Sequence, residues 1–353
     1  SGIYIGKNAG SNISSGPGSN VIIGSSTSAN TAAEGSVGVG AGSVVNDFSV
    51  AIGGSSGASD FGVASGYFAS ADFESVAIGT LAGGGFLSVS MGYRALNVGT
   101  GAYNIAIGHT AMEQNISGYH NVAVGGYALG GNTSGYDNVA IGLSSLAAFG
   151  GSSHSNTSVG SRALINLNAG TYNTAVGVDA NTSIGTLDNV TLLGANTVAF
   201  SNNSVRVGDT NVSSIGGFED WTNFSDGRFK HQVEENVPGL DFVMALRPVT
   251  YQLNIPELRR EMGQEETYYN PEKETIRQTG FIAQEVEQTA QDLGYSFSGV
   301  DRPEEESDGF YGLRYATFTV PLVKAVQEQQ DLIDQLLQKI EALEARIETL
   351  ENE

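Results

Sequence analysis

The sequence contains no cysteine, only 7 prolines and only 16 basic residues among 353. The absence of Cys excludes disulfide cross-links and thiolate metal ligands. Because 38 acidic residues outnumber the basic ones, the formal net charge is −22, which disfavours nucleic acid as a partner, since phosphate binding needs clustered Lys and Arg. No run of about 18 apolar residues occurs, so we expect no membrane insertion of this segment.

Glycine, in contrast, is abundant, with 48 residues, about twice the average usage. It does not recur at every third position, which excludes a collagen helix. Apolar residues make up 40% of the chain and recur in order, which argues against disorder. Residues 1–216 hold 4 basic and 10 acidic residues, net −6, leaving −16 for residues 217–353. A nearly neutral region therefore precedes an acidic one.

A repeated unit organises the chain up to about residue 208. It consists of a small residue or Asn, an apolar–small–apolar triplet and a Gly, as in SVAIG at 49–53 and NIAIG at 104–108. The alternation is typical of a half-buried strand, and the Gly permits the positive φ of a tight corner. The closing glycines recur every 13 residues and then every 16–18: Gly40, Gly53, Gly66, Gly79 and Gly92, followed by Gly108, Gly125, Gly142, Gly160, Gly177 and Gly194.

The repeat length limits what one unit can form. Thirteen residues extend to at most about 43–47 Å, enough for one coil of chain with corners. One such rung buries only about two or three apolar side chains, less than the backbone entropy requires, so we expect stacked rungs and several chains sharing a core. The sequence predicts a mainly β region followed by an α+β region, the former a trimeric parallel β-roll or β-prism. Because the chain opens within a repeat, at residues 3–6, we expect it to be the C-terminal part of a longer protein.

The two repeat lengths resemble two groups of fibrous proteins. The 13-residue units resemble the head repeats of trimeric autotransporter adhesins. The units of about 17 residues, with Ala-Leu after the glycine at 95–96, 128–129 and 163–164, are similar to repeats in phage and bacterial fibre proteins. The resemblance implies a fibre outside the cell, at a cell surface or on a virion tail, that attaches to a cell-surface glycan or protein receptor.

The pattern changes after Gly217. Residues 221–230 read WTNFSDGRFK, so Lys230 follows Ser225 by five positions. A desolvated Lys can lose its proton and serve as general base for a Ser hydroxyl, a nucleophilic pair that needs no His or Asp. The spacing alone is weak evidence, because a capping Ser followed by a surface Lys would give the same pattern.

Downstream motifs strengthen this interpretation. LRPVTY at 246–251, GFIAQEVE at 280–287 and Tyr315 precede a helical tail. Together with the Ser–Lys pair they resemble the peptidase S74 family, the C-terminal chaperone of endosialidases and many phage tail fibres, over about residues 220–353. The sequence departs from the family pattern after Val286 and in the acidic insert 304–306, which is interpreted as a solvated loop.

The resemblance implies self-cleavage and assembly. The scissile bond would join Phe224 to Ser225, with Ser225 as nucleophile and Lys230 as general base. Asp226 belongs to the motif, but no role can be assigned to it. The chaperone would trimerise and register the preceding fibre, and no turnover of an external substrate is expected.

The helical tail carries a heptad pattern with Ile at a and Leu at d, a choice that favours two-stranded parallel coiled coils. Residues 346–351, RIETLE, instead resemble a short trimer-specifying motif. Since the fibre and chaperone resemblances both imply trimers, we predict a three-stranded coiled coil. The residues expected at its seam are Ile333, Leu336, Ile340, Leu343, Arg346, Ile347, Leu350 and Glu351.

We therefore predict a homotrimer with a shaft at 1–216, a junction at 217–224, a chaperone at 225–325 and a coiled coil at 326–353. The alternative is a structural adhesin with a permanent, uncleaved C-terminal cap. A polysaccharide-degrading enzyme is less favoured, since the shaft shows no recurring carboxylate pair.

Two groups of side chains are interpreted as structural. The four His are scattered without metal-ligand spacing, so we expect no metal and no cofactor. Four Tyr share one repeat position and could stack on sugars, but packing between rungs is favoured; they are Tyr103, Tyr119, Tyr136 and Tyr172.

Overall fold

The computed structural model describes residues 2–11, 19–29, 33–148, 151–264, 269–303 and 309–352. The chain divides into two compact units: residues 1–215 together with 256–269, and residues 216–255 together with 270–353. The acidic insert at 304–306 lies outside the described residues.

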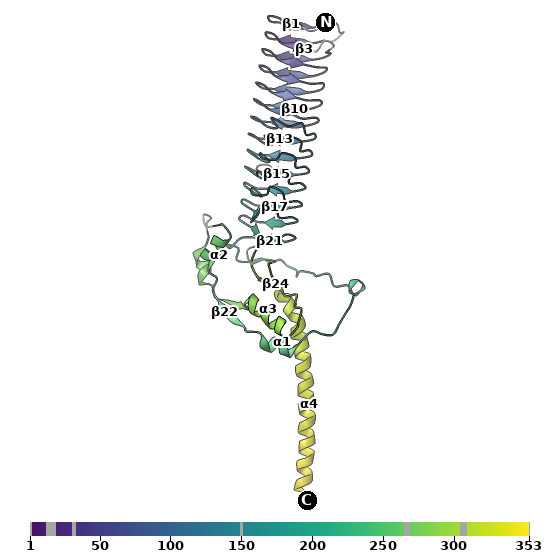
Figure 1. The fold of residues 1–353 in the computed structure, drawn as a ribbon, viewed down its shortest axis with the longest axis vertical. Helices are drawn as coiled ribbons and strands as arrows, with labels where there is room; N and C mark the ends of the chain where they lie inside the picture. Colours follow the sequence, from purple (N-terminus) through teal and green to yellow (C-terminus); the bar gives the residue numbers. More distant parts are fainter. Residues whose placement is uncertain are drawn as a thin grey trace. The chain divides into compact units, whose positions relative to one another are not determined.

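The first unit contains a parallel β-solenoid, called the shaft below, whose rungs stack in register (Figure 1). Within the described residues its long sheet has 14 strands, with every neighbouring pair parallel. They are β1 (Ile3–Ile5), β2 (Val21–Ile23), β4 (Val37–Val39), β6 (Val50–Ile52), β8 (Val63–Ser65), β10 (Val76–Ile78), β12 (Val89–Met91), β13 (Ile105–Ile107), β14 (Val122–Val124), β15 (Val139–Ile141), β16 (Thr157–Val159), β17 (Thr174–Val176), β19 (Thr191–Leu193) and β21 (Val205–Val207).

Shorter strands close the other side of the 13-residue rungs. They are β3 (Ser28–Ala29), β5 (Val44–Val45), β7 (Gly57–Ala58), β9 (Ser70–Ala71) and β11 (Gly83–Gly84), with β18 (Asn181–Thr182) and β20 (Val198–Ala199) as a separate pair. Each of these rungs closes within one chain. The predicted mainly β, parallel architecture is confirmed, in the form of a parallel β-solenoid.

The change of repeat length leaves the strands in phase. Val76 pairs with Val89 at an offset of 13, Val89 with Ile105 at 16, and Val139 with Thr157 at 18. The additional residues of the longer rungs lie in the turns that replace the short strands. Residues at equivalent positions therefore form continuous columns along the shaft.

The corner glycines are required for two reasons. Gly53 has a φ of 133°, which L side chains rarely adopt. A Cβ on Gly53 would also collide with the carbonyl oxygen of Gly66 in the next rung. The predicted role of the glycines at the corners is confirmed.

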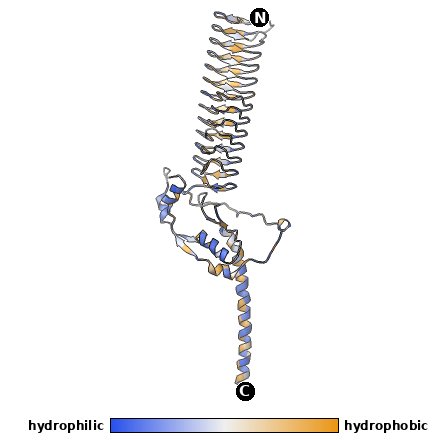
Figure 2. Ribbon diagram, viewed as in Figure 1, coloured by the Kyte–Doolittle hydropathy of each residue, from blue (hydrophilic) through white to orange (hydrophobic). Residues whose placement is uncertain are grey.

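The small residue of each triplet fills the interior, and its larger neighbours face outward. Ala51, Ala77 and Ala106 are fully buried, whereas Ile107 and Ile141 are exposed. Figure 2 shows the apolar colouring of these strands along the shaft. The outward Val, Ile, Met and Leu residues at both ends of the triplets form what we call the lateral apolar face.

Leucines supply the rest of the interior in the longer rungs. The Leu of each Ala-Leu pair is buried, at Leu96, Leu129 and Leu164. Each such side chain contributes about 1.5–3 kcal/mol to folding.

Buried asparagines form a second internal column. The side-chain amide nitrogen of Asn121 donates to Asn104 Oδ1 at 3.2 Å, and its backbone N–H donates to the same oxygen at 3.0 Å. The pattern repeats from Asn138 to Asn121, Asn156 to Asn138 and Asn173 to Asn156. Because buried amides must be hydrogen-bonded, this ladder explains why Asn opens the longer repeats.

A segment distant in sequence also packs on the shaft. Residues 256–264 include most of α2 (Ile255–Glu261) and belong to the first unit. Arg259 is only 2% exposed and donates to Thr210 Oγ1 at 3.2 Å, and Gln264 Nε2 donates to the carbonyl oxygen of Asn196 at 2.5 Å. This segment, called the clasp below, lies within the sequence range expected for the chaperone.

The second unit is a small α+β domain. Its elements are the 3-10 helix η1 (Gly227–Phe229), α1 (Leu240–Ala245), β22 (Val249–Tyr251), η2 (Pro271–Thr275), β23 (Gln278–Gly280), α3 (Ala283–Asp292), β24 (Val300–Asp301), β25 (Gly312–Leu313), η4 (Tyr315–Phe318) and α4 (Thr319–Glu351). β22 pairs antiparallel with β23, and β24 with β25. Phe242, Val286, Ala290 and Phe318 form its core.

The long helix α4 includes the predicted coiled-coil region. Pro321 and Ala325 are buried within the unit, but every apolar residue expected at the coiled-coil seam is exposed. Apolar and polar colouring alternate along α4 (Figure 2). In one chain this stripe has no partner among the described residues.

Candidate functional site

The predicted Ser–Lys pair is brought together by a tight turn. Asp226 caps η1, since its Oδ1 accepts a hydrogen bond of 2.9 Å from the Arg228 backbone N–H. The turn returns the chain on itself, so that Lys230 Nζ lies 2.7 Å from Ser225 Oγ. This is the contact that a general base needs with the hydroxyl it deprotonates.

Asp226 has a second partner in the Arg228 side chain. Arg228 Nη2 lies 2.6 Å from Asp226 Oδ2, and Arg228 Nε donates to both carboxylate oxygens. These side-chain hydrogen bonds, followed by the backbone one, lower the pKa of Asp226 and raise that of Arg228. Asp226 thus has a contact that sequence reasoning could not assign: it fixes the turn that places Lys230. The Asp-Gly pair, with its capping carboxylate, was the available signal.

The pair is open to water in one chain. Ser225 and Lys230 are both exposed, and Phe224, on the other side of the predicted scissile bond, is 81% exposed. The Phe224 and Phe229 rings lie 5.6 Å apart and both project from the surface. Within the described part of one chain, nothing supplies the dry environment that favours a neutral Lys.

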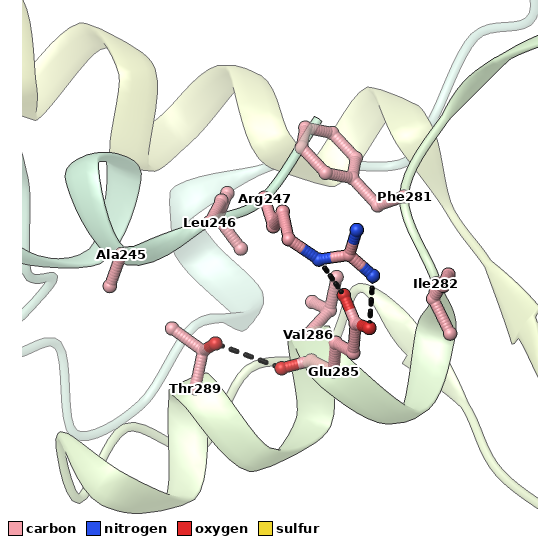
Figure 3. A pocket seen from close by; sticks show the side chains of 8 residues that line it. All are labelled: Ala245, Leu246, Arg247, Phe281, Ile282, Glu285, Val286 and Thr289. Atoms are coloured by element: carbon pink, nitrogen blue, oxygen red, sulfur yellow. Dashed lines mark hydrogen bonds and ion pairs between the residues drawn. The ribbon is translucent and has the colours of Figure 1, made fainter. Parts of the chain in front are cut away.

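The downstream sequence motifs meet at one place. Arg247 Nε donates to Glu285 Oε2 at 2.9 Å, and the resulting ion pair lowers the pKa of Glu285 and raises that of Arg247. Glu285 comes from α3 and Arg247 from the loop between α1 and β22 (Figure 3). Tyr315 joins them, because its hydroxyl accepts a hydrogen bond of 3.2 Å from the Phe281 backbone N–H.

A small hollow lies between these motifs. Its volume is about 150 Å³, and Figure 3 shows the Arg247–Glu285 pair across it. A neighbouring pocket of about 420 Å³ shares Phe281 and Ile282 with it. The Arg247–Glu285 pair therefore joins α3 to the loop before β22, and none of the motif residues contacts Ser225 or Lys230 in the interactions described above.

The residues predicted at the trimer seam remain on one exposed helix. Arg346 and Glu351 both lie on α4, and within the described part of the chain no ion pair joins them. The sequence analysis missed two features. It did not predict that the clasp around Arg259 packs on the shaft, and it did not predict that the residues of the lateral apolar face point outward.

In the part of the chain that the structure describes, no group of three or more His, Asp or Glu side chains is placed to hold a metal ion. Among the same residues, no helix has the length and apolarity needed to cross a bilayer.

The domain after the junction is an α+β module with an exposed Ser–Lys pair at its start. Residues 225–295 match the family model described as the chaperone of endosialidase. The match begins at Ser225 and extends past α3, and it confirms the predicted resemblance for this part of the chain. Neither the curated proteins nor the solved structures give a match. A chaperone of this type behind a β-solenoid shaft fits a fibre with an intramolecular chaperone.

Proposed function

We propose that this chain is the C-terminal part of a homotrimeric fibre whose chaperone assembles the shaft and then cuts itself off between Phe224 and Ser225. The observation that carries the proposal is the 2.7 Å contact between Lys230 Nζ and Ser225 Oγ, located at the first residue of the family match. The fibre would be carried on a cell surface or on a virion tail, and it would attach to the surface of a target cell.

The cut can be written with these two side chains and one water. Neutral Lys230 takes the proton of the Ser225 hydroxyl, and Oγ attacks the carbonyl carbon of Phe224. The C–N bond breaks as the Ser225 nitrogen takes the proton back from Lys230, leaving an ester between Phe224 and Oγ. Water then hydrolyses the ester, giving a carboxylate on Phe224 and restoring the Ser225 hydroxyl.

Trimer formation is supported by two unpartnered apolar surfaces. The lateral apolar face runs along the 14 strands of the described long sheet, and α4 exposes a stripe from Ile333 to Leu350. Monomeric soluble proteins rarely expose contiguous apolar patches of more than a few hundred Å². Three copies that bury both surfaces remove them from water.

The chaperone solves a kinetic problem of such a shaft. Shafts that associate side by side must find one register among many that differ by whole rungs. Joining the three C-terminal units first makes the later pairing intramolecular and sets that register. Cutting them off afterwards removes the route by which the assembly could come apart, which leaves kinetic stability.

The exposure of the Ser–Lys pair supports a mechanism in which assembly precedes cleavage. Ser225 and Lys230 are open to water in one chain, and burial is what favours the neutral form of a Lys. A neighbouring chain that covers Phe224 and Phe229 would dry the pair as well. Cleavage therefore follows assembly.

The test is a denaturing gel with mass spectrometry. Wild-type chain should separate into fragments 1–224 and 225–353, whereas Ser225→Ala and Lys230→Ala should stay whole and still trimerise. Wild-type chain that remains intact after prolonged incubation at neutral to mildly basic pH would refute self-cleavage. That result would favour the alternative, a structural adhesin with a permanent C-terminal cap.

A further inference from the structure

The shaft contains a cavity that its repeat pattern does not require. The cavity has a volume of about 270 Å³ and lies on turn segments of successive long rungs. The registers place Glu113, Gly130, Ala147 and Ile165 in one column, at offsets of 17, 17 and 18. Two consecutive small residues between Glu113 and Ile165 leave the hollow.

An aromatic ring forms one wall of this cavity. Tyr93 and His109 stack with ring centroids 5.2 Å apart, and the Tyr127 ring lies tilted beside His109 with centroids 5.4 Å apart. At the position equivalent to Tyr127, the next rung has Ser144. Tyr127 is 50% exposed, and among the described residues His109 is the one ring in contact with it.

The remaining lining contains both polar and apolar groups. Glu113, Gln114 and the hydroxyl-bearing Thr110 and Ser144 are on the lining, together with the apolar carbons of Ala147, Ala148 and Ile165. Carboxylate and amide oxygens accept hydrogen bonds from hydroxyl groups, and the amide N–H₂ donates. The cavity thus combines a half-exposed aromatic ring, apolar side chains and several hydrogen-bonding groups.

We propose that this cavity, called the Tyr127 pocket below, binds a neutral saccharide. The apolar C–H face of a pyranose ring would pack on Tyr127, and its hydroxyl groups would meet Glu113 and Gln114. At about 270 Å³ the pocket is just below the range of drug-sized ligands, about 300–1,000 Å³, and suits about one or two sugar rings. The inference deepens the proposed attachment role and rests on it.

The charge of the site selects against acidic sugars. Among the described residues no Lys or Arg lines the pocket, and the nearby Arg94 already pairs with Glu113 at 2.9 Å. The shaft region itself carries a formal net charge of −6 over residues 1–216. A sialic or uronic acid would therefore meet repulsion and no compensating cation.

Saturation-transfer NMR and titration calorimetry on the full chain test the proposal. The neutral probes are maltotriose, lactose and triacetylchitotriose, and sialyllactose is the acidic comparison. At least one neutral probe should bind, more tightly than sialyllactose. Tyr127→Ala should weaken that binding about tenfold, and Ala147→Leu, which fills the hollow and removes no polar group, should do the same. Tyr172→Ala, at an exposed ring of another stack, should leave it unchanged.

The outcomes separate this inference from the proposed function. Failure of all three neutral probes, equal binding by the Ala147→Leu variant, or preference for sialyllactose would overturn the saccharide pocket. Light scattering and denaturing gels on the same samples report assembly and cleavage independently. A cleaved trimer that binds no neutral probe contradicts only the pocket, whereas a monomeric, uncut chain that binds through Tyr127 contradicts only the assembly mechanism.

Discussion

Arg259 Nη1 donates a hydrogen bond of 3.2 Å to Thr210 Oγ1, although the two residues lie on opposite sides of the Phe224–Ser225 bond in the sequence. The clasp thus holds the end of the shaft with residues from the part that would be cut off. Breaking one peptide bond does not break this contact.

The two fragments should therefore stay together under native conditions after the cut. Size exclusion should show one species, which separates only on denaturation. Arg259→Ala should release the chaperone fragment more readily, by about 1–3 kcal/mol in association free energy, because the oxygens it contacts lose their partner. Arg260→Ala removes a neighbouring exposed Arg that pairs with Glu257 and should have little effect. Spontaneous separation of the wild-type fragments would contradict a holding role for the clasp.

Asp226 should matter for cleavage through geometry. Asp226→Ala loses both the cap and the Arg228 pair and should slow cleavage by more than about tenfold, while Asp226→Asn keeps a capping oxygen and should retain more activity. The measurement is the time course of fragment appearance. Equal rates for the Ala and Asn variants would indicate that the cap does not position Lys230.

The pH dependence of cleavage should come from Lys230 and not from Asp226. Because the pKa of Asp226 is lowered by Arg228, its ionised, turn-stabilising form is fully present above the ordinary Asp pKa of about 3.9 and is lost only as the pH falls through the lower folded value. The rate should nevertheless fall as the pH is lowered, since a protonated amine cannot accept the Ser225 proton. A rate that does not change with pH would exclude Lys230 as the base.

The lateral apolar face should mediate association. Ile141 lies on this face and Leu143 lies just beyond the corner Gly142, and both are exposed apolar residues of one rung. Ile141→Asp should reduce trimer formation, since a charge would be buried between copies, while Leu143→Asp should be tolerated. Light scattering reads the mass, and a value near one or two chains for the wild type would contradict the trimer itself.

The internal Asn ladder should set the thermal stability of the longer rungs. Asn138→Ala leaves the partners of its amide unsatisfied inside the shaft and should cost about 1–3 kcal/mol. Asn166→Ala, at an exposed position, should stay close to the wild type. The measurement is the melting temperature of both variants by calorimetry, in the uncleaved Ser225→Ala background. Equal melting temperatures for Asn138→Ala and Asn166→Ala would mean that the ladder contributes nothing to stability.

The alternating triplets reveal strands and corners, but not which face lies inside. A period of two distinguishes Ala51 from Val50 and Ile52, yet the direction depends on how narrow the interior is, which the sequence of one rung does not give. Because the two sides of a rung approach closely, most triplets have Ala or Ser at the inward position, with Ile22 and Leu192 as the larger exceptions, and the residues on either side face outward. The corner glycines were predictable because their φ is a local property.

In the candidate site, too, the local contacts could be predicted from the sequence and the long-range contacts could not. Ser225 and Lys230 could be predicted because five residues of local chain fix their contact. The clasp could not, since Arg259 meets Thr210 across 49 positions with no repeat pattern to indicate it. The predicted packing of tyrosines between rungs is visible in Tyr119 and Tyr136, which stack at 5.0 Å with an interplanar angle of 3°. Tyr127 was missed because its surroundings occur once and not in every repeat.

The stacking of rungs of 13, 16, 17 and 18 residues in one phase has a further consequence. Every difference in length is absorbed by the turns, so each rung adds the same rise, about 4.8 Å, whatever its residue count. Inserting or deleting one complete rung between two corner glycines would therefore change the length of the shaft by the same amount, whichever rung is chosen. The lateral apolar face, the clasp and the chaperone would all remain as they are, and the number of rungs would set the length of the shaft.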